Sequence, residues 1–367
     1  MADKETYTVR FEPVGVEMDV EEGETVLEAG FRHGIALMHG CKEGQCSSCK
    51  SRLLEGDIEL KKYSTFALAD YERETDHILL CRTLAYSDLV VELLNYDEDL
   101  MRRSIPVRGY AAEVAAVETL APDIRLLRLT LDQPLRFWAG QYVDITIPDA
   151  AGPDDAGPGI GDPDAAGITR AFSMANPPAA EASVEFIIKH YPDGAFSGRL
   201  DGGPSGGGLK PGDRLAVKGP YGTCFRHESR DGMMVLIGGG SGMSPLWSIL
   251  QDHIRSGEQR PIRFFYGART EAHLFYRDEF AALEKSLPDF RFIPALSDHD
   301  GSTEWAGETG FIHEVAARVL RDEKLDGAID AYTCGPPPMI DAVIPVLQMA
   351  GFEPEQIHFD KFTTAAH

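Results

Sequence analysis

Cys41-Lys-Glu-Gly-Gln-Cys46-Ser-Ser-Cys49 is the stretch that decides how this chain folds. It places three thiols at a C-x4-C-x2-C spacing in a loop of small residues, and Cys81 supplies a fourth thiol further along the chain. This spacing is typical of a plant-type 2Fe-2S cluster, in which each iron takes two thiolates. We therefore expect this loop to hold three ligands and a distant strand to supply the last one.

The small residues of the loop support the same interpretation. Gly44, Ser47 and Ser48 favour turns that direct backbone N–H groups toward sulfur, and such hydrogen bonds help to set the reduction potential. Zinc and inert core thiols are the alternatives. Structural zinc mostly uses two C-x2-C pairs or pairs of Cys and His, whereas this segment has one such pair and two outlying thiols. The pattern favours the cluster.

The composition bounds the class of protein. The 367 residues suffice for two or three domains, and 43% hydrophobic residues allow sizeable cores. The net charge of −24 argues against nucleic acid or an anionic membrane surface as a partner. It favours docking to a basic surface, although an acid-rich solvated exterior is an equally good explanation. We expect a monomer.

Cysteine usage and the N-terminus indicate a cytoplasmic location. Four cysteines are assigned to iron, which leaves Cys224 and Cys334, far apart in the sequence, with no need to be paired. Such usage fits a reducing compartment. The first residues lack a basic segment followed by an apolar run, and no stretch has the eighteen or so apolar residues of a membrane span.

Residues 1–103 are predicted to form a ferredoxin-like β-grasp domain. Alternating apolar and polar residues indicate strands, and apolar residues at helical spacing before Gly34 indicate a helix. The domain has 22 acidic and 12 basic residues, a net charge of −10. The expected elements are strands at 6–12 and 16–20, a helix at 25–33, and strands at 51–56, 78–84 and 89–93.

Residues 104–228 are predicted to form an antiparallel β-barrel, after a charged linker over 95–108. Two insertions rich in Asp, Gly and Pro, at 149–168 and 201–208, lack the apolar surface that ordering requires, so we expect mobile loops there. The expected strands are 124–131, 142–147, 183–189 and 214–218.

Residues 229–367 are predicted to form an α/β domain with a parallel sheet. A strand over 233–237 leads into the glycine loop Gly238-Gly-Gly-Ser-Gly242, and a helix and a second strand at 261–267 follow. Backbone N–H groups at such a loop bind a pyrophosphate, although the pattern alone also fits a tight structural turn. A further strand over 328–334 ends at Gly335-Pro-Pro-Pro338. The fold class is therefore multidomain, α+β and α/β.

The segment Arg170-Ala-Phe-Ser173 by itself could be any edge strand. Together with Lys189 and the later Gly194-Ala-Phe-Ser197 it resembles the flavin motif of the ferredoxin-NADP reductase superfamily. The resemblance implies that Arg170 meets the flavin pyrophosphate, that Phe172 lies against the flavin in place of the commoner Tyr, and that the Ser173 hydroxyl approaches flavin N5.

The rest of the chain extends this resemblance. Gly219-Pro-Tyr-Gly222 resembles the superfamily's G-P-x-G turn, and Cys334-Gly335-Pro336 resembles the motif whose thiol lies beside the nicotinamide. The order of cluster, flavin and nicotinamide regions resembles the reductase components of bacterial multicomponent oxygenases. Residues 41–55 and 62–72 look most like the reductases of soluble diiron monooxygenases, in particular the propane monooxygenase reductases of actinobacteria.

That resemblance implies three cofactors: a 2Fe-2S cluster, FAD and NADH. NADH gives up two electrons as a hydride whereas the cluster takes one at a time, and a flavin can mediate between them. Ser173 and Cys334 are the implied catalytic residues, and no general base is needed, so His190 and His273 are expected to be structural. The remaining implied cofactor-binding residues are Gly239, Gly240, Ser241, Gly242, Arg269, Glu271, Gly335, Pro336 and Phe362.

Arg269 and Glu271 bear on the choice of nicotinamide, because the end of the second strand of a βαβ unit faces the adenosine ribose. An acid there favours NADH and a base favours NADPH. We weight Glu271 above Arg269, because a 2'-phosphate would need a second base beside Arg269 and the sequence offers none before Arg277. We therefore expect NADH to be preferred over NADPH.

The expected partner is the hydroxylase of a diiron monooxygenase. The alternatives are a Rieske dioxygenase partner and a redox sensor without turnover.

Overall fold

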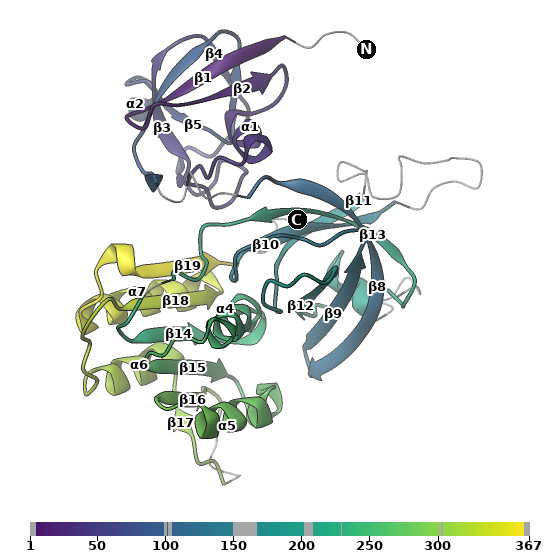
Figure 1. Cartoon of the computed structure of the whole chain (residues 1–367), viewed down its shortest axis with the longest axis vertical. Coiled ribbons are helices and arrows are strands. Elements are labelled where there is room, and N and C mark those ends of the chain that lie inside the picture. The colour runs from purple at the N-terminus through teal and green to yellow at the C-terminus, as the bar shows by residue number, and fades with distance from the viewer. Residues whose placement is uncertain are drawn as a thin grey trace. The chain divides into compact units, whose positions relative to one another are not determined.

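The computed structural model divides into two compact units, 1–108 with 219–223, and 109–218 with 224–367. Figure 1 labels most of the helices and strands of both units. No helix within the described ranges is long and apolar enough to cross a membrane. The described residues are 5–98, 101, 105–149, 167–201, 208–228, 230–299, 301 and 304–362.

The first unit is built on a five-stranded sheet of order β2-β1-β7-β3-β5. β1 pairs antiparallel with β2 and parallel with β7, so the two ends of the domain's chain lie side by side at its centre. A two-stranded sheet, β4 with β6, lies outside it. The elements are β1 Thr6–Glu12, β2 Val16–Glu21, α1 Val26–His33, β3 Lys50–Glu55, β4 Ile58–Leu60, α2 Asp70–Arg73, β5 His77–Leu79, β6 Thr83–Ala85 and β7 Leu89–Leu93.

Helix α1 begins and ends where its sequence predicts. Thr25 and Glu28 form a reciprocal capping box at its start, which satisfies two otherwise unpaired donors. Gly34 caps its end in the left-handed conformation with φ 70°. The apolar face of the helix packs into the core of this unit.

The predicted strand over 78–84 was wrong. The chain forms β5 and β6 with a turn between them, and Cys81 lies in that turn. Arg82 N–H donates to Leu79 O at 2.8 Å and Leu80 N–H to Cys49 O at 3.2 Å, so the local hydrogen bonds close a turn and bring Cys81 to the cysteine loop.

The second unit begins with a six-stranded sheet of order β11-β10-β13-β8-β9-β12, whose pairs β10–β11, β8–β9 and β9–β12 are antiparallel. Ala175, just after β11, donates its N–H to Glu185 O of β12 at 2.7 Å. The two edge strands therefore meet, as the predicted barrel requires. The strands are β8 Arg108–Ala121, β9 Ile124–Leu131, β10 Tyr142–Pro148, β11 Gly167–Ser173, β12 Ser183–Lys189 and β13 Arg214–Tyr221.

The ranges predicted for the two mobile loops, 149–168 and 201–208, include residues that the structure places in fixed positions. Gly167 and Ile168 belong to β11 and pair with Pro148 and Ile147. Asp201 forms an ion pair with the buried Arg125 and is therefore fixed. Residues 150–166 and 202–207 lie outside the described residues.

The rest of this unit is a parallel sheet of order β17-β16-β15-β14-β18-β19. β14 is buried throughout, with α4 and α5 packed on one face of the sheet and α6 and α7 on the other. The elements are β14 Met234–Gly238, α4 Met243–Ser256, β15 Ile262–Ala268, α5 Arg277–Ser286, β16 Phe290–Leu296, β17 Glu308–Thr309, α6 Ile312–Leu320, β18 Asp330–Gly335, α7 Pro337–Ala350 and β19 Ile357–Lys361.

Candidate cofactor sites

The cysteine loop turns backbone N–H groups toward its own thiols. Gln45 and Glu43 donate to Cys41 Sγ at 3.1 and 3.4 Å, and Cys41 N–H donates to Cys46 Sγ at 3.2 Å. Gly44 has φ 71°, and a Cβ there would come within 2.9 Å of both Tyr63 and Arg82. The position therefore requires glycine, and the loop presents donors that stabilise thiolates.

The four thiols lie in two pairs. Cys49 and Cys81 are buried with their sulfur atoms 3.3 Å apart. Cys41 and Cys46 form the second pair, and the hydrogen bond from Cys41 lowers the pKa of the Cys46 thiol to about 4. Among the described residues no three His, Cys, Asp or Glu side chains are grouped to hold a single metal ion. Two pairs fit two irons with two thiolates each.

The predicted flavin residues lie on β11, the edge strand of the barrel sheet. Ser173 is buried and pairs with Tyr142 of β10. Phe172 is half-buried and packs against Phe196 with ring centroids 4.7 Å apart. Arg170 donates to Thr169 O at 2.7 Å and keeps partial exposure. The alternation along this strand turns consecutive side chains to opposite faces.

Gly194 lies in the turn before the short 3₁₀ helix Ser197–Leu200, and Ser197 is the first residue of that helix. The Ser197 hydroxyl accepts from Tyr191 N–H at 3.1 Å, and a Cβ on Gly194 would come within 2.4 Å of Ser197 Oγ. Lys189 is 2.5 Å from Asp123, so its ammonium already has a carboxylate partner.

The glycine loop joins β14 to α4 through the short 3₁₀ turn Gly240–Gly242. A Cβ on Gly239 would come within 2.1 Å of Gly267 O, and one on Gly242 within 2.0 Å of Cys334 O. The loop is therefore pressed against the carboxyl ends of the neighbouring strands β15 and β18. In an open α/β sheet this edge, beside a helix N-terminus, is where dinucleotides bind.

Cys334 lies at the end of β18 and is fully buried. Gly335 follows with φ 152°, and Pro336 is the N-cap of α7. Phe362, just beyond β19, donates its N–H to Gly335 O at 2.8 Å. Sheet topology thus brings Cys334, Gly335, Phe362 and the glycine loop to one edge.

Ser244 joins the flavin region to the nicotinamide region. It lies in the first turn of α4, 2% exposed, and its hydroxyl donates to Ser173 O at 2.7 Å and accepts from Ile187 N–H at 3.1 Å. Ser248, one turn later, donates to Asn176 O at 2.7 Å. The helix that begins at the glycine loop is therefore hydrogen-bonded directly to the ends of β11 and β12.

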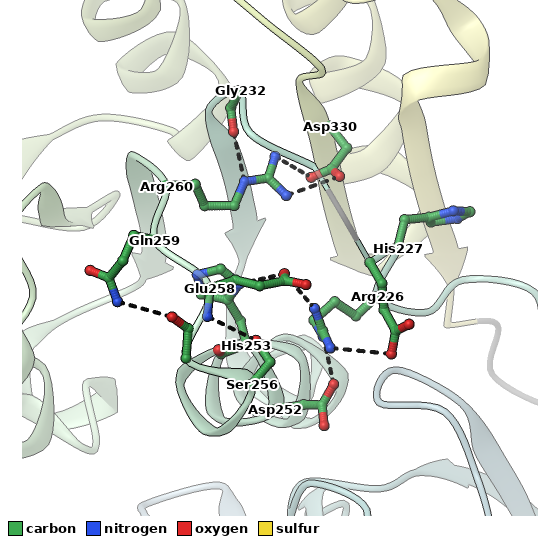
Figure 2. A network of polar contacts seen from close by, with 12 residues as sticks. Arg226, His227, Gly232, Asp252, His253, Ser256, Glu258, Gln259, Arg260 and Asp330 are labelled. Carbon is green, nitrogen blue, oxygen red and sulfur yellow. Dashed lines mark hydrogen bonds and ion pairs between the residues drawn. The ribbon is translucent and has the colours of Figure 1, made fainter.

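A buried ionic network makes a further connection, shown in Figure 2. Arg226, which follows β13, is 2.5 Å from Asp252 of α4 and 2.9 Å from Glu258. Arg260 and Asp330 form a second, fully buried pair at 3.1 Å, and Arg260 also donates to Gly232 O at 2.6 Å. The Arg226 pairs join the segment after the last barrel strand to α4, whereas the Arg260 pair lies within the parallel-sheet part.

Sequence analysis missed two neighbours of Cys334. Cys224, far away in the sequence, lies with Cys334 in the same buried cluster, and neither forms a disulfide. Asp360 of β19 pairs with Cys334 across the sheet, and burial raises the pKa of its carboxyl to about 6. No local motif marks either residue; only the pairing of β18 with β19 could have found Asp360.

Arg269 and Glu271 follow β15 on the surface. Arg269 is 70% exposed and 3.9 Å from Asp298, and Glu271 is 3.2 Å from Arg277. Arg277, the next base along the chain, is thus brought beside Glu271 by the short turn that follows Glu271. His273 hydrogen-bonds with Thr270 at 2.9 Å, which suits a structural role.

Comparisons with known proteins match three domain families in chain order. The 2Fe-2S iron-sulfur cluster binding domain matches residues 9–86, the oxidoreductase FAD-binding domain matches 111–225, and the oxidoreductase NAD-binding domain matches 236–344. The cofactor set expected from sequence, an iron-sulfur cluster, FAD and a nicotinamide, is thus confirmed at the level of domains.

Full-length relatives give the same assignment. The propane 2-monooxygenase reductase component of Gordonia sp. strain TY-5 is 43% identical over 370 residues, covering 100% of this chain and 99% of the relative. The phenol 2-monooxygenase reductase component DmpP of Pseudomonas sp. strain CF600 is 37% identical, covering 98% and 96%.

Solved structures agree. The Amycolatopsis cytochrome P450 reductase GcoB superimposes with a TM-score of 0.82 at 30% identity, covering 98% of this chain and 100% of that one. The ferredoxin reductase in carbazole 1,9a-dioxygenase gives 0.73 at 29% identity, with 99% and 100% covered.

Proposed function

This chain belongs to the iron-sulfur flavoprotein reductases that include the reductase components of bacterial monooxygenases, and from that premise we propose that it passes electrons from NADH to the hydroxylase of a soluble diiron monooxygenase. The observation that carries the proposal is Ser244, whose hydroxyl joins the Ser173 strand to the helix of the glycine loop. Hydride transfer requires that flavin and nicotinamide meet at such a junction.

The first cofactor in this proposal is the iron-sulfur cluster. Cys41, Cys46, Cys49 and Cys81 would hold the cluster, and the amides around Cys41 would stabilise its thiolates. When bound, FAD and the cluster supply the conversion of a two-electron hydride into single electrons.

On the flavin side, Arg170, Phe172, Gly194 and Ser197 would position FAD, and Ser173 would lie at its reactive edge. Gly239 to Gly242 would receive the nicotinamide pyrophosphate at the start of α4. Cys334, Gly335 and Phe362 would border the nicotinamide ring. The buried Cys334 thiol, whose pKa burial raises, stays protonated and so positions by contact rather than by charge.

The preference for NADH is assigned to Glu271. Its carboxylate would accept hydrogen bonds from the free ribose hydroxyl of NADH and repel the phosphate of NADPH. Arg277 beside it partly neutralises this charge, so the discrimination is expected to be about tenfold, roughly 1.4 kcal/mol. Steady-state kcat/KM for both nucleotides tests this. Glu271→Gln should narrow the ratio, and a wild-type preference for NADPH would remove the assignment.

The acceptor is tested by reconstitution. NADH oxidation is measured with this chain and the purified hydroxylase of a propane-type diiron monooxygenase, with product formation as the readout. Tight coupling of NADH to product supports the proposal. The structural likeness to a carbazole dioxygenase reductase makes a Rieske oxygenase the second candidate, and preferential turnover of that partner would favour it. A chain that binds FAD and cluster but is not bleached by NADH would be a sensor instead.

The domain boundaries, the cellular location and the oligomeric state are also proposals. We assign the cluster domain to 1–103, the FAD domain to 104–228 and the NAD domain to 229–367, in agreement with the matched family ranges. A cytoplasmic monomer fits a reductase that must release one partner and return to NADH. Sedimentation with and without the hydroxylase tests the monomer.

A further inference from the structure

Phe66 is turned almost completely toward solvent, at 97% exposure. The residues that follow it, Ala67 and Leu68, are buried, and their amides donate to Ser64 O at 2.9 and 3.2 Å. The chain therefore forms one tight turn with its base in the core and its apolar ring outside. A Phe ring in water gives up the free energy that burial would provide, so an exposed ring in this position favours contact with another surface.

This turn is attached to the cysteine loop. Ser64 N–H donates to Gly44 O at 3.0 Å, and Gly44 lies between Cys41 and Cys46 with the Tyr63 side chain packed against it. Phe66 is thus only two residues from a direct hydrogen bond to the loop that carries the thiols. A partner that covers Phe66 would approach the cluster domain on the side of its cysteine loop.

The charge of the domain specifies the partner's surface. Among residues 62–76 the exposed acids Asp70, Glu74 and Asp76 outnumber the exposed bases Lys62 and Arg73. Residues 1–103 carry a net charge of −10, and the remaining residues carry the other −14 of the chain's −24. A basic counterpart is therefore better supplied by a different protein than by the rest of this chain.

We propose that Phe66 anchors the cluster domain to the oxygenase component that accepts its electrons, in an apolar pocket of that partner rimmed by basic residues. Aromatic anchors carry a large share of binding energy in protein interfaces. The inference rests on the proposed function, because it needs an external electron acceptor. It adds the surface that this acceptor recognises.

The test compares Phe66→Ala with Phe311→Ala, a matched substitution of a 61% exposed Phe in the second unit. Three rates are measured for each: hydroxylase-dependent NADH oxidation, ferricyanide reduction, and bleaching of the cluster by NADH in stopped flow. Phe66→Ala should raise the KM for hydroxylase at least about fivefold and leave the other two rates within about twofold. Phe66→Tyr should restore most of the affinity, and Phe311→Ala should change nothing.

The outcomes separate the claims. An unchanged KM in Phe66→Ala, with the wild type active on the hydroxylase, overturns the docking surface and leaves the proposed function intact. Slower bleaching of the cluster by NADH in Phe66→Ala also overturns the docking surface, because the ring would then be needed for electron transfer within this chain. If the wild type reduces ferricyanide but supports no turnover of a diiron hydroxylase, both the proposed function and the docking surface are wrong.

Discussion

The cysteine loop and the nicotinamide edge are built in opposite ways. Three of the four thiols lie within one nine-residue loop, and the backbone turns of that loop direct the donors to sulfur. The proposed nicotinamide edge collects Ser241 of the glycine loop, Cys334 of β18 and Phe362 beyond β19, and the Ser244 hydroxyl joins it to Ser173 of the flavin region. A site of the first kind depends on local sequence, and one of the second kind depends on packing between elements.

The sharpest test of this difference is Cys46→Ser. Because the loop is local, the substitution should abolish electron delivery to protein acceptors by removing a cluster ligand, while NADH reduction of the flavin stays nearly intact. Stopped-flow absorbance separates the flavin and cluster bands. Loss of both steps together would show that the two sites are not independent.

Ser244→Ala tests the packed site. Without its hydroxyl, Ser173 O loses a donor and Ile187 N–H loses an acceptor, and both groups are buried. The flavin and nicotinamide regions then keep the hydrogen bond from Ser248 to Asn176 O but lose the two made by Ser244. We expect flavin reduction by NADH to slow about tenfold with a smaller change in the Kd for NADH, because reacting groups must be held closely. Ser256→Ala, at the far end of α4, is the control. Equal effects of the two substitutions would indicate a general loss of helix stability.

Asp360→Asn changes the pH dependence of stability. Burial raises the pKa of Asp360 to about 6, above its ordinary 3.8, so the fold favours the neutral carboxyl and loses stability as pH rises through 6. Between pH 5 and 7.5 the wild type should lose on the order of 1 kcal/mol relative to the variant. Urea unfolding of both proteins at the two pH values measures this. Parallel curves would show that the Asp360 carboxyl is solvated.

The smallest effect is expected from deletion of residues 151–165. This stretch holds only small, acidic and proline residues apart from Ile160, and its ends stay clear of the strand pairs formed by Pro148 and Gly167. Flavin reduction should change less than about twofold. A large loss of bound FAD from the deleted protein would give the segment a role at the flavin.

Much of the fold could be predicted from local signals. The helix at 25–33 with Gly34 at its end was predicted from residue spacing, and so were the strand, glycine loop and helix that begin at Met234. The turn at Cys81 could not be predicted, because the largely apolar segment from Ile78 to Leu84 resembles a single strand. Hydrogen bonds from Leu80 N–H to Cys49 O and from Arg82 N–H to Leu79 O close the turn, and neither is marked in the sequence. Strand β8 also went without a prediction, since five of its fourteen residues are Ala, which is uncommon in strands.

In the candidate sites, too, residues in a local motif were predicted and residues brought together by packing were not. All four cysteines were predicted from spacing, and the structure brings them together in two pairs. Asp360 and Cys224 were missed because their relation to Cys334 exists only after β19 is placed beside β18 and the segment after β13 folds back. Contacts between distant elements leave no periodicity or motif in one sequence.

The close approaches of Gly239 to Gly267 O and of Gly242 to Cys334 O carry an evolutionary consequence. These glycines are required because neighbouring backbone leaves no room for a side chain, whether or not a nucleotide is bound. A descendant that lost its cofactor would still retain them under selection for folding alone. The glycine signature in a diverged homologue therefore marks descent, and its catalytic state must be judged from residues that the packing does not constrain.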